Sequence, residues 1–465
     1  MRLRPCVVCG PFGFSIAFLA AFAPSTAAAQ PPPDEPAPAA PEPQWAPPLL
    51  EEPPSAPAPT PPPEQTAPAQ GAASVATPSE STTAQPEERS STMEIYGFAM
   101  LDGGYDFGAI GNPDWQDVLR PTMLPSSPDE YGHGGRTFAG VRQSRFGTKT
   151  DTPTAVGDIK TVFEWELFGV GVDAGQTTFR LRHAYGKWHG LRAGQTWSPF
   201  MDPDVFPDSV EYWGPPGMAF FRNVQLAYSF WEDGDSDFTV AVERPGATAD
   251  QSSIEDRIDL TNVVPRFPAP DVSADLKLAS WWGYFRISGI FRYMRWDVLG
   301  NESPGIAPGH VVGGGVNVSG NIKLDPALIK LQFVYGSAIE NYMNDAGPDV
   351  GPKTIDPLMI STVTGTGLQV FGLVAFVDLK WCDALTSTAG YSLVWIDNSA
   401  DQAATSFHLG QYALGNLLFH PTKSLFFGPE FQYGRRTNAF DGFSSNDYRL
   451  QFSVKYNFSH TVGGH

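Results

Sequence analysis

The sequence predicts an all-β fold, a transmembrane antiparallel β-barrel of about sixteen strands. Three observations predict it: an export signal, an alternation of apolar and polar residues from Met93 onward, and connecting segments that are alternately long and short. The 465 residues are 13% aromatic and include 47 glycines, and the exported part has no apolar run of about 18 residues that could form a membrane-spanning helix. This profile is typical of barrels whose strands face lipid on one side and water on the other.

Residues 1–29 are predicted to be a signal peptide. Arg2 and Arg4 precede a mostly apolar stretch, and three alanines at 27–29 provide small residues for cleavage. Two of the three cysteines lie in this peptide, so Cys382 alone remains and an intrachain disulfide is excluded. We therefore expect an exported protein, placed in the outer membrane of a Gram-negative bacterium.

Residues 30–92 are predicted to be a Pro/Ala-rich, disordered periplasmic tether. The segment nearly lacks large apolar residues, so folding would bury too little surface to offset the entropy lost on ordering. We expect an extended, semi-stiff spacer. Attachment of the barrel to the cell wall is the alternative role.

The barrel is predicted over residues 93–458, and its last strand shows the alternation most clearly. Tyr448, Leu450, Phe452, Val454, Tyr456 and Phe458 alternate with Arg449, Gln451, Ser453, Lys455 and Asn457. A strand with one apolar and one polar face belongs to a two-sided sheet, here with lipid outside and water inside. The aromatic end of this strand is similar to the assembly signal of outer-membrane barrels, and residues 459–465 would form a short C-terminal tail.

The connecting segments sort into seven short and eight long ones. The short ones lie near 152–157, 189–190, 232–236, 282–283, 325–326, 383–384 and 421–424, and the long ones near 108–134, 169–177, 197–222, 244–273, 299–310, 337–365, 398–407 and 434–447. Short periplasmic turns that alternate with long external loops are what an up-and-down membrane barrel requires. Fifteen connectors join sixteen strands and leave both chain ends in the periplasm.

Surface contacts with the membrane can be predicted as well. Aromatic residues at strand ends are expected to form the two interfacial girdles, and these are Trp188, Trp197, Trp281, Trp282, Trp296, Trp381 and Trp395. The expected partners are outer-membrane lipid and lipopolysaccharide. Much of the acid is expected in outer loops near 250–259 and 344–356, where it could bind divalent cations.

Basic side chains are predicted to line the lumen. Because Phe179 and Leu181 are apolar, Arg180 and Arg182 between them should point inward, and the same parity applies to the other strands. The predicted pore-lining basic residues are Arg145, Lys149, Arg180, Arg182, Arg192, Arg286 and Arg292. Such a cluster attracts carboxylates and can bind them bidentately. The alternative is that these arginines only balance acids inside the protein.

The third long connector is predicted to fold inward as a constriction loop. A barrel of sixteen strands leaves a wide lumen, so something must narrow it. The loop carries four acids and two aromatic residues, Asp202, Asp204, Asp208, Glu211, Tyr212 and Trp213. We expect an acidic, aromatic loop near the basic wall, with an ordinary solvated external loop as the alternative.

Four runs resemble a known family. They are RQSRFGTKTDTPTAVGDIKT (142–161), FGVGVDAGQTTFRLRHAYG (168–186), AGQTWSPFMDPDVFPDSVEYWGPPGMAFFRNVQ (193–225) and ERPGATAD (243–250). Together they are similar to the DcaP-like porins, trimeric outer-membrane channels linked to dicarboxylate uptake. The resemblance implies a sixteen-stranded barrel, a homotrimer and passage of small anionic solutes. The proline-rich tether departs from the helical segment that such proteins can carry.

The expected function is therefore passive diffusion of small hydrophilic solutes, with a preference for anions such as dicarboxylates. A general or sugar-accepting porin and an envelope-tethering structural barrel are the alternatives. No catalytic residue, metal site or cofactor is expected, because the histidines show no ligand spacing and no nucleophile motif is present. The net charge of −20 argues against nucleic-acid binding.

Overall fold

The computed structural model describes residues 90–111, 115–246, 255–299, 305–355 and 362–463. The predicted signal peptide and nearly all of the predicted tether lie outside these residues. The described chain is almost entirely β-structure, with short 3-10 helices in the loops. No helix in these ranges is long and apolar enough to cross a membrane.

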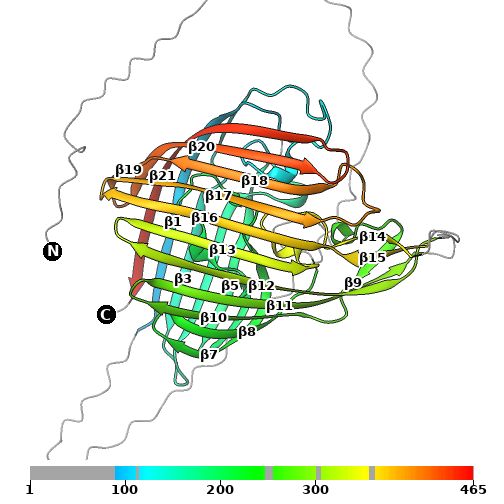
Figure 1. Ribbon diagram of the computed structural model, residues 1–465. Coiled ribbons are helices and arrows are strands. Elements are labelled where there is room, and N and C mark those ends of the chain that lie inside the picture. The colour runs from blue at the N-terminus through cyan, green and yellow to red at the C-terminus, as the bar shows by residue number, and fades with distance from the viewer. Residues whose placement is uncertain (1–89, 112–114, 247–254, 300–304, 356–361, 464–465) are drawn as a thin grey trace, which may run out of the picture. The chain divides into compact units, whose positions relative to one another are not determined.

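The strands close into one antiparallel barrel (Figure 1). They are β1 (Thr92–Asp106), β2 (Arg136–Gly140), β3 (Arg145–Thr152), β4 (Ile159–Phe168), β5 (Thr177–Trp188), β6 (Leu191–Trp197), β7 (Arg222–Asp233), β8 (Ser236–Glu243), β9 (Val263–Arg266), β10 (Asp271–Ser280), β11 (Gly283–Val298), β12 (Gly309–Leu324), β13 (Ala327–Ser337), β16 (Gln369–Cys382), β17 (Leu385–Asp397), β18 (Phe407–Asn416), β19 (Leu418–Thr422), β20 (Leu425–Asn438) and β21 (Ser444–Gly463). A separate hairpin consists of β14 (Val350–Thr354) and β15 (Val363–Gly367).

These nineteen strands form a wall that is sixteen strands in circumference, because some consecutive strands follow one another along the same line of the sheet. Three positions are each shared by two consecutive strands: β2 and β3 both pair with β1, β9 and β10 both pair with β11, and β18 and β19 both pair with β17 and β20. The barrel closes where β1 pairs with β21. The predicted sixteen-stranded antiparallel barrel is confirmed.

The period-two alternation places apolar side chains outside. On β11, Phe285, Ile287 and Phe291 are exposed on the outer face, whereas Ser288 and Arg292 are buried inside. Cross-strand pairs share a face, so Ile287 lies opposite Leu276 and Val318 on the neighbouring strands. The outer face is therefore an apolar belt and the inner face is polar.

Two predictions about the ends of the wall are wrong. The last strand continues to Gly463, so residues 459–463 are not a tail: Ser459 pairs with Tyr96, and its hydroxyl donates to Glu94 over 2.6 Å. Trp197 and Trp296 do not belong to the girdles. The first lines an internal cavity, and the second is fully buried and donates its indole N–H to the Ala307 carbonyl.

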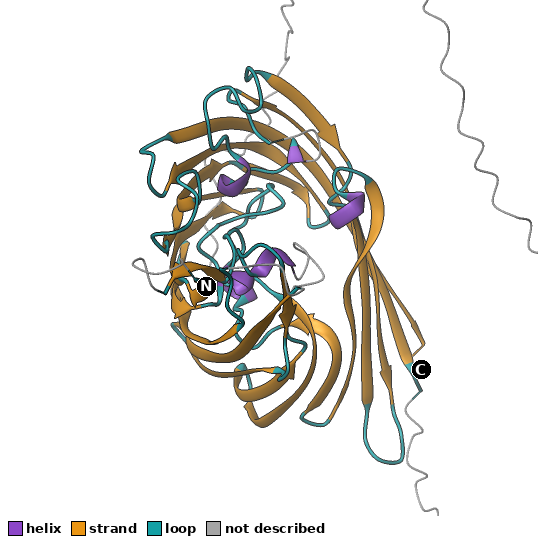
Figure 2. Cartoon of the chain, turned by 90° about the vertical axis from the view of Figure 1, so that its right-hand side faces the viewer, coloured by secondary structure: helices purple, strands orange, loops and turns teal. Residues whose placement is uncertain are grey.

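Three loops fold into the barrel instead of projecting from it (Figure 2). We call them loop 1 (residues 107–135), loop 3 (198–221) and loop 6 (338–349). Short 3-10 helices lie on them: η2 (Pro121–Met123) on loop 1, η4 (Pro203–Val205) on loop 3 and η6 (Glu340–Tyr342) on loop 6. Two further ones, η3 (Gly171–Asp173) and η5 (Glu255–Arg257), lie on other loops.

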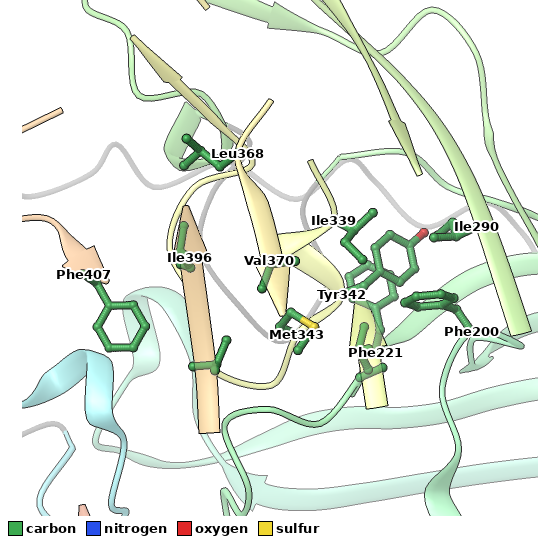
Figure 3. Packing of buried hydrophobic residues seen from close by; sticks show 13 residues of the cluster. Phe200, Phe221, Ile290, Ile339, Tyr342, Met343, Leu368, Val370, Ile396 and Phe407 are labelled. Atoms are coloured by element: carbon green, nitrogen blue, oxygen red, sulfur yellow. The ribbon is translucent and has the colours of Figure 1, made fainter. Parts of the chain in front are cut away.

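The inward loops share hydrophobic cores with the wall. In one cluster, shown in Figure 3, Phe200 and Phe221 of loop 3 meet Tyr342 and Met343 of loop 6 beside Val370 of β16. The rings of Phe221 and Tyr342 stack with their centroids 4.0 Å apart. A second cluster joins residues of loops 1 and 3 to β16 and β18. Burial of this kind fixes the loops, since each large apolar side chain contributes about 1.5–3 kcal/mol.

Glycines allow loop 3 to lie directly on the wall. A Cβ at Gly217 would overlap the carbonyl oxygen of Leu393, and one at Gly372 would overlap the carbonyl oxygen of Gly217. The Gly217 amide also donates to Ser392 Oγ over 3.0 Å. Only glycine permits this approach of one backbone to another.

We predict that Gly217→Val displaces loop 3 from β16 and β17. The added branched side chain has no space at this contact, so single-channel conductance in planar bilayers should rise while the barrel still assembles. Gly415→Val, on β18 at a glycine with ordinary backbone conformation and open space around it, is the control and should leave conductance unchanged. Unaltered conductance of the Gly217 variant would show that loop 3 does not narrow the lumen.

Candidate functional site in the lumen

Loop 3 is anchored at its start by β11 and β12. Asp202 caps η4 by accepting the Asp204 amide over 3.2 Å. The same buried carboxylate accepts hydrogen bonds from Tyr284 Oη over 2.8 Å and Ser319 Oγ over 2.5 Å. It also lies 3.6 Å from Arg286, so this acid holds the loop instead of facing a solute.

The middle of loop 3 is held by the opposite part of the wall. The carboxylate of Glu430 on β20 accepts the backbone amide of Val210 over 3.0 Å and the hydroxyl of Ser209 over 2.8 Å. The Val210 carbonyl in turn accepts from Gln143 and Gln451. The loop therefore crosses the lumen, and the predicted inward fold of loop 3 is confirmed.

Tyr212 and Trp213 connect loop 3 to the remaining parts of the interior. The Tyr212 ring stacks on Phe168 of β4 with centroids 3.9 Å apart, and its hydroxyl donates to Glu166. Trp213 lies under the guanidinium of Arg120, 4.0 Å from the ring centroid, and donates its N–H to the Asn344 carbonyl. This part of the loop joins loops 1 and 6 to the wall of β4 and β5.

An arginine cluster occupies that wall. Four guanidinium groups surround the buried carboxylate of Glu166, those of Arg182 at 2.6 Å, Arg145 at 3.4 Å, Arg180 at 3.6 Å and Arg222 at 4.0 Å. A second acid of β4 pairs with two of the same arginines, at 2.8 and 3.5 Å. Four guanidinium groups therefore converge on two carboxylates of β4 among the described residues.

Arg222 of this cluster was not predicted. It is the first residue of β7 and directly follows Phe220 and Phe221 of loop 3. At this junction the alternation of the strand does not yet predict whether a side chain points inward or outward. Its guanidinium stacks 5.1 Å from the Trp197 ring centroid, and the side chain is fully buried. An arginine inside an apolar run is the sequence signal that could have found it.

A bulge in β5 changes the predicted parity. Glu164 pairs with His183 but Trp165 pairs with Leu181, so Arg182 is the extra residue. Arg182 and His183 consequently both point inward, and His183 Nδ1 lies 3.0 Å from Thr196 Oγ1. Strict alternation along β5 predicts that His183 points outward. That prediction is wrong, because the bulge shifts the pairing of β5 with β4 by one residue.

The other predicted basic residues are scattered. Lys149 is half-exposed 3.9 Å from Glu94, Arg192 donates to Gln225, and Arg286 pairs with Asp275 at 3.0 Å. Arg292 does not line an open lumen. It is fully buried between Asp271 and Asp349, each 3.0 Å away, because loop 6 packs over it.

The acids of loop 3 also divide by role. Asp204 pairs with Lys277 at 2.7 Å, and Asp208 is exposed. Glu211 is buried, accepting the Leu119 amide of loop 1 over 3.1 Å and the Gly214 amide. Burial raises the pKa of Glu211 to about 7, although backbone hydrogen bonds oppose the shift. The loop is thus less acidic toward the lumen than its sequence suggests.

Below loop 3 lies a cavity of about 400 Å³. Its charged lining consists of Arg145, Arg182, Lys455, Asp208 and Glu211. Its aromatic lining consists of Phe98, Trp197, Phe206, Tyr212, Phe220 and Phe426, with His420 beside them. Of the seven predicted pore-lining residues, Arg145 and Arg182 reach this cavity. Lys455 was not among them, although its inward parity in the last strand was the available signal.

We predict that acid stabilises the packed position of loop 3 through Glu211. A raised pKa means that the packed form binds the proton more tightly than a form with the loop displaced, so the stabilisation is complete at low pH and is lost as the pH rises through about 7. Single-channel conductance should therefore rise between pH 5 and pH 8. Glu211→Gln should lose this dependence, and an unchanged pH profile in that variant would contradict the assignment.

A sequence model of the DcaP outer membrane protein family matches residues 78–278. This range contains β1 to β9, most of β10, the arginine cluster and loop 3. It therefore includes all four runs on which the predicted resemblance depends. A comparison with curated protein sequences finds no match.

Solved structures share the fold. The outer membrane channel DcaP of Acinetobacter baumannii aligns with a TM-score of 0.64 at 20% identity, over 79% of this chain and 98% of that one. Two barrels align more loosely. The anion-selective porin from Comamonas acidovorans has a TM-score of 0.48 at 9% identity, over 80% of this chain and 100% of that one. The trimer form of OmpT from Vibrio cholerae has a TM-score of 0.47 at 11% identity, over 79% of this chain and 100% of that one.

The family match and the shared barrel agree with the resemblance predicted from the four runs. The family match also indicates the outer membrane of a Gram-negative bacterium as the location of the protein. Over residues 78–278 the chain is similar to the DcaP outer membrane proteins, and its barrel has the fold of an outer membrane DcaP channel.

Proposed function

We propose that the barrel allows passive diffusion of small hydrophilic solutes and prefers anions such as dicarboxylates. The observation that carries the proposal is the convergence of four guanidinium groups where loop 3 meets β3, β4 and β5. Arg145 and Arg182 of that cluster line the cavity beside the loop, together with Lys455. An anion that enters this cavity meets three basic side chains at close range.

The surroundings strengthen this field. The walls are protein and hydrocarbon of low dielectric constant, which focus the field of the arginines into the lumen. At physiological ionic strength the Debye length is about 8 Å, so charges on the cavity lining act on a solute inside it with little screening. Guanidinium groups also match carboxylates in a planar, two-point geometry. A solute with two carboxylates gains more from such a wall than one with a single charge.

The overall acidity of the chain does not oppose this preference. Asp202 and Glu211 of loop 3 are buried in hydrogen bonds, and Asp204 is paired with Lys277. Asp208 is the exposed acid that faces the cavity from the loop. Local charge in the lumen decides selectivity, and the cavity beside loop 3 is lined by Arg145, Arg182 and Lys455.

Aromatic side chains around the cavity favour a second candidate, a porin that accepts neutral sugars. Sugar rings pack on aromatic faces, and Phe98, Trp197 and Phe426 line the same space. Liposome swelling separates the two functions. Faster entry of neutral sugars than of dicarboxylates of similar size would favour the sugar porin.

We also propose that the barrel forms a homotrimer through the outer face of β1 and β3–β6. On this face small and polar residues stand among large apolar ones such as Phe146 and Phe163, and these small and polar residues are Gly97, Ala99, Thr148, Thr161, Ala184, Gly186, Ala193 and Gln195. On β7 the corresponding residues are Val224, Leu226, Tyr228 and Phe230. Small residues allow close packing between protein walls within a membrane.

The edge of β5 supports the same interface. Only its residues from Ala184 to Trp188 pair with β6, so Thr177–His183 are paired on the β4 side alone. Phe179 on this stretch is 80% exposed. Backbone groups without partners are costly in hydrocarbon, so contact with a neighbouring protomer is favourable here.

We predict that the wild-type channel shows anion preference in planar bilayers with a salt gradient. The sign of the reversal potential is the measurement, and a cation-selective sign would contradict the proposed function. Arg180→Ala combined with Arg182→Ala should shift the potential toward cations, because two positive charges are removed beside the acids of β4.

We predict that Ala184→Trp disrupts the trimer. The large side chain would stand on the proposed interface, so the mass in mild detergent should fall from three protomers to one. Ala274→Trp, on the lipid-facing side of β10, is the matched control and should remain trimeric. A monomeric wild type would refute the trimer, and a trimeric Ala184 variant would refute the location of its interface.

A further inference from the structure

Lys455 on β21 differs from the other cations that line the cavity. Arg145 and Arg182 each lie within 4 Å of a carboxylate of β4. In the part of the chain that the structure describes, Lys455 forms neither an ion pair nor a hydrogen bond. Among those residues, no carboxylate lies within ion-pair distance of its ammonium group.

Two aromatic rings hold this lysine in place. Lys455 Nζ lies 3.8 Å from the ring centroid of Phe98 on β1 and 5.5 Å from that of Phe426 on β20. Such cation–π contacts are worth about 0.5–2 kcal/mol. They fix the ammonium group and leave its hydrogen-bond donors available. The side chain is partly exposed to the cavity.

A second cation shares one of these rings. The guanidinium of Arg145 on β3 lies 5.1 Å from the centroid of Phe98. Both cations lie near the Phe98 ring. The distance between Lys455 Nζ and the Arg145 guanidinium is therefore at most the sum of their distances to the centroid of that ring. Two like charges in a cavity with low-dielectric walls repel each other, and an anion between them relieves that repulsion.

The cavity lining also carries an acid. Asp208 projects from loop 3, and its carboxylate lies within ion-pair distance of no described cation. Glu430 and Asn416 hold the backbone around it. The cavity thus has an ammonium group on its wall and a carboxylate on its loop that do not form a direct ion pair, and an anion is drawn toward the ammonium group on β21.

We infer that Lys455, with Arg145 beside it, forms a binding site for the carboxylate group of a permeating solute, and that Lys455 determines the anion preference of the channel. The inference rests on the proposed function and specifies which residues of the lumen produce the anion preference. The buried arginines of the cluster set the background potential. Lys455 supplies the charge that a solute contacts directly, because its donors are not shared with a protein carboxylate.

The test is the reversal potential of Lys455→Gln in a potassium chloride gradient. The ratio of anion to cation permeability should fall about two- to threefold or more relative to wild type, because an unpaired charge near the narrow part of the lumen is removed. Lys455→Arg retains the charge and should retain the ratio. Succinate added on one side should block current in wild type more strongly than in Lys455→Gln.

Lys149→Gln is the matched comparison. Lys149 also lies over an aromatic ring of β1, with its Nζ 4.2 Å from the Tyr96 centroid, but it has Glu94 as a partner at 3.9 Å. Its removal should change the ratio less than removal of Lys455. Lys423→Gln, in an exposed periplasmic turn, controls for a change of net charge and should have no effect.

The outcomes separate the two proposals. A wild-type channel that prefers cations would overturn the proposed function. A wild type that prefers anions, with Lys455→Gln unchanged or no more affected than Lys149→Gln, would overturn the role of Lys455 and leave the proposed function standing. Channel insertion by every variant at a similar protein concentration confirms that the barrel has formed in each.

Discussion

The structure depends on one constraint: a chain that crosses hydrocarbon must satisfy its own backbone hydrogen bonds. Pairing of β1 with β21 meets it by closing the sheet, so that the first and last strands of the described barrel become neighbours. Closure divides the side chains into an outer and an inner set, and the period of two decides the set to which each belongs. The lumen, its charges and its loops all follow from that division.

The inner set would enclose a wide space, and three inward loops occupy much of it. Because these loops are themselves polypeptide, they bring amides and carbonyls that also need partners. Side chains of the wall supply many of them: Glu430 accepts two amides of loop 3 directly, Asn317 donates to the Phe200 carbonyl, and Lys330 donates to that of Phe206. Polar residues on the inner face are therefore structural as well as electrostatic.

Because residues of the inner face both hold the loops and carry charge, few of the inward-pointing cations are available to a solute. Arg286 and Arg292 neutralise acids that hold loops 3 and 6. The cluster around Glu166 is partly used in the same way, since its arginines pair with two acids of β4. Internal neutralisation, one of the two alternatives considered for the basic wall, therefore occurs near loop 6 and in part near β3–β5, where an additional role toward solutes is the proposed one.

The fold could be predicted because alternation and connector length are local properties of the sequence. The residues of β11, β13 and β21 carry their direction in their own pattern. The inward fold of loop 3 followed from its place between the fifth and sixth positions of the wall. The contributions of loops 1 and 6 could not be predicted, since their burial depends on contacts such as Arg120 with Asp345 that join distant segments.

Site residues were predictable where parity held and not where it failed. Arg145 and Arg182 were found by alternation, whereas the bulge at Arg182 reversed the expected direction of His183. Parity alone says nothing of partners, so it could not distinguish Arg292, enclosed by two acids, from Lys455, which has none among the described residues. That distinction required the packed structure.

The most direct measurement of the central claim is the oxygen accessibility of spin labels placed one at a time along residues 448–456, in a Cys382→Ser background, with the protein in lipid bilayers. The account predicts high accessibility at Leu450, Phe452 and Val454 and low accessibility at the residues between them, a period of two through the strand. Uniformly low accessibility, or a period near 3.6, would mean that this face does not meet lipid and would contradict the barrel.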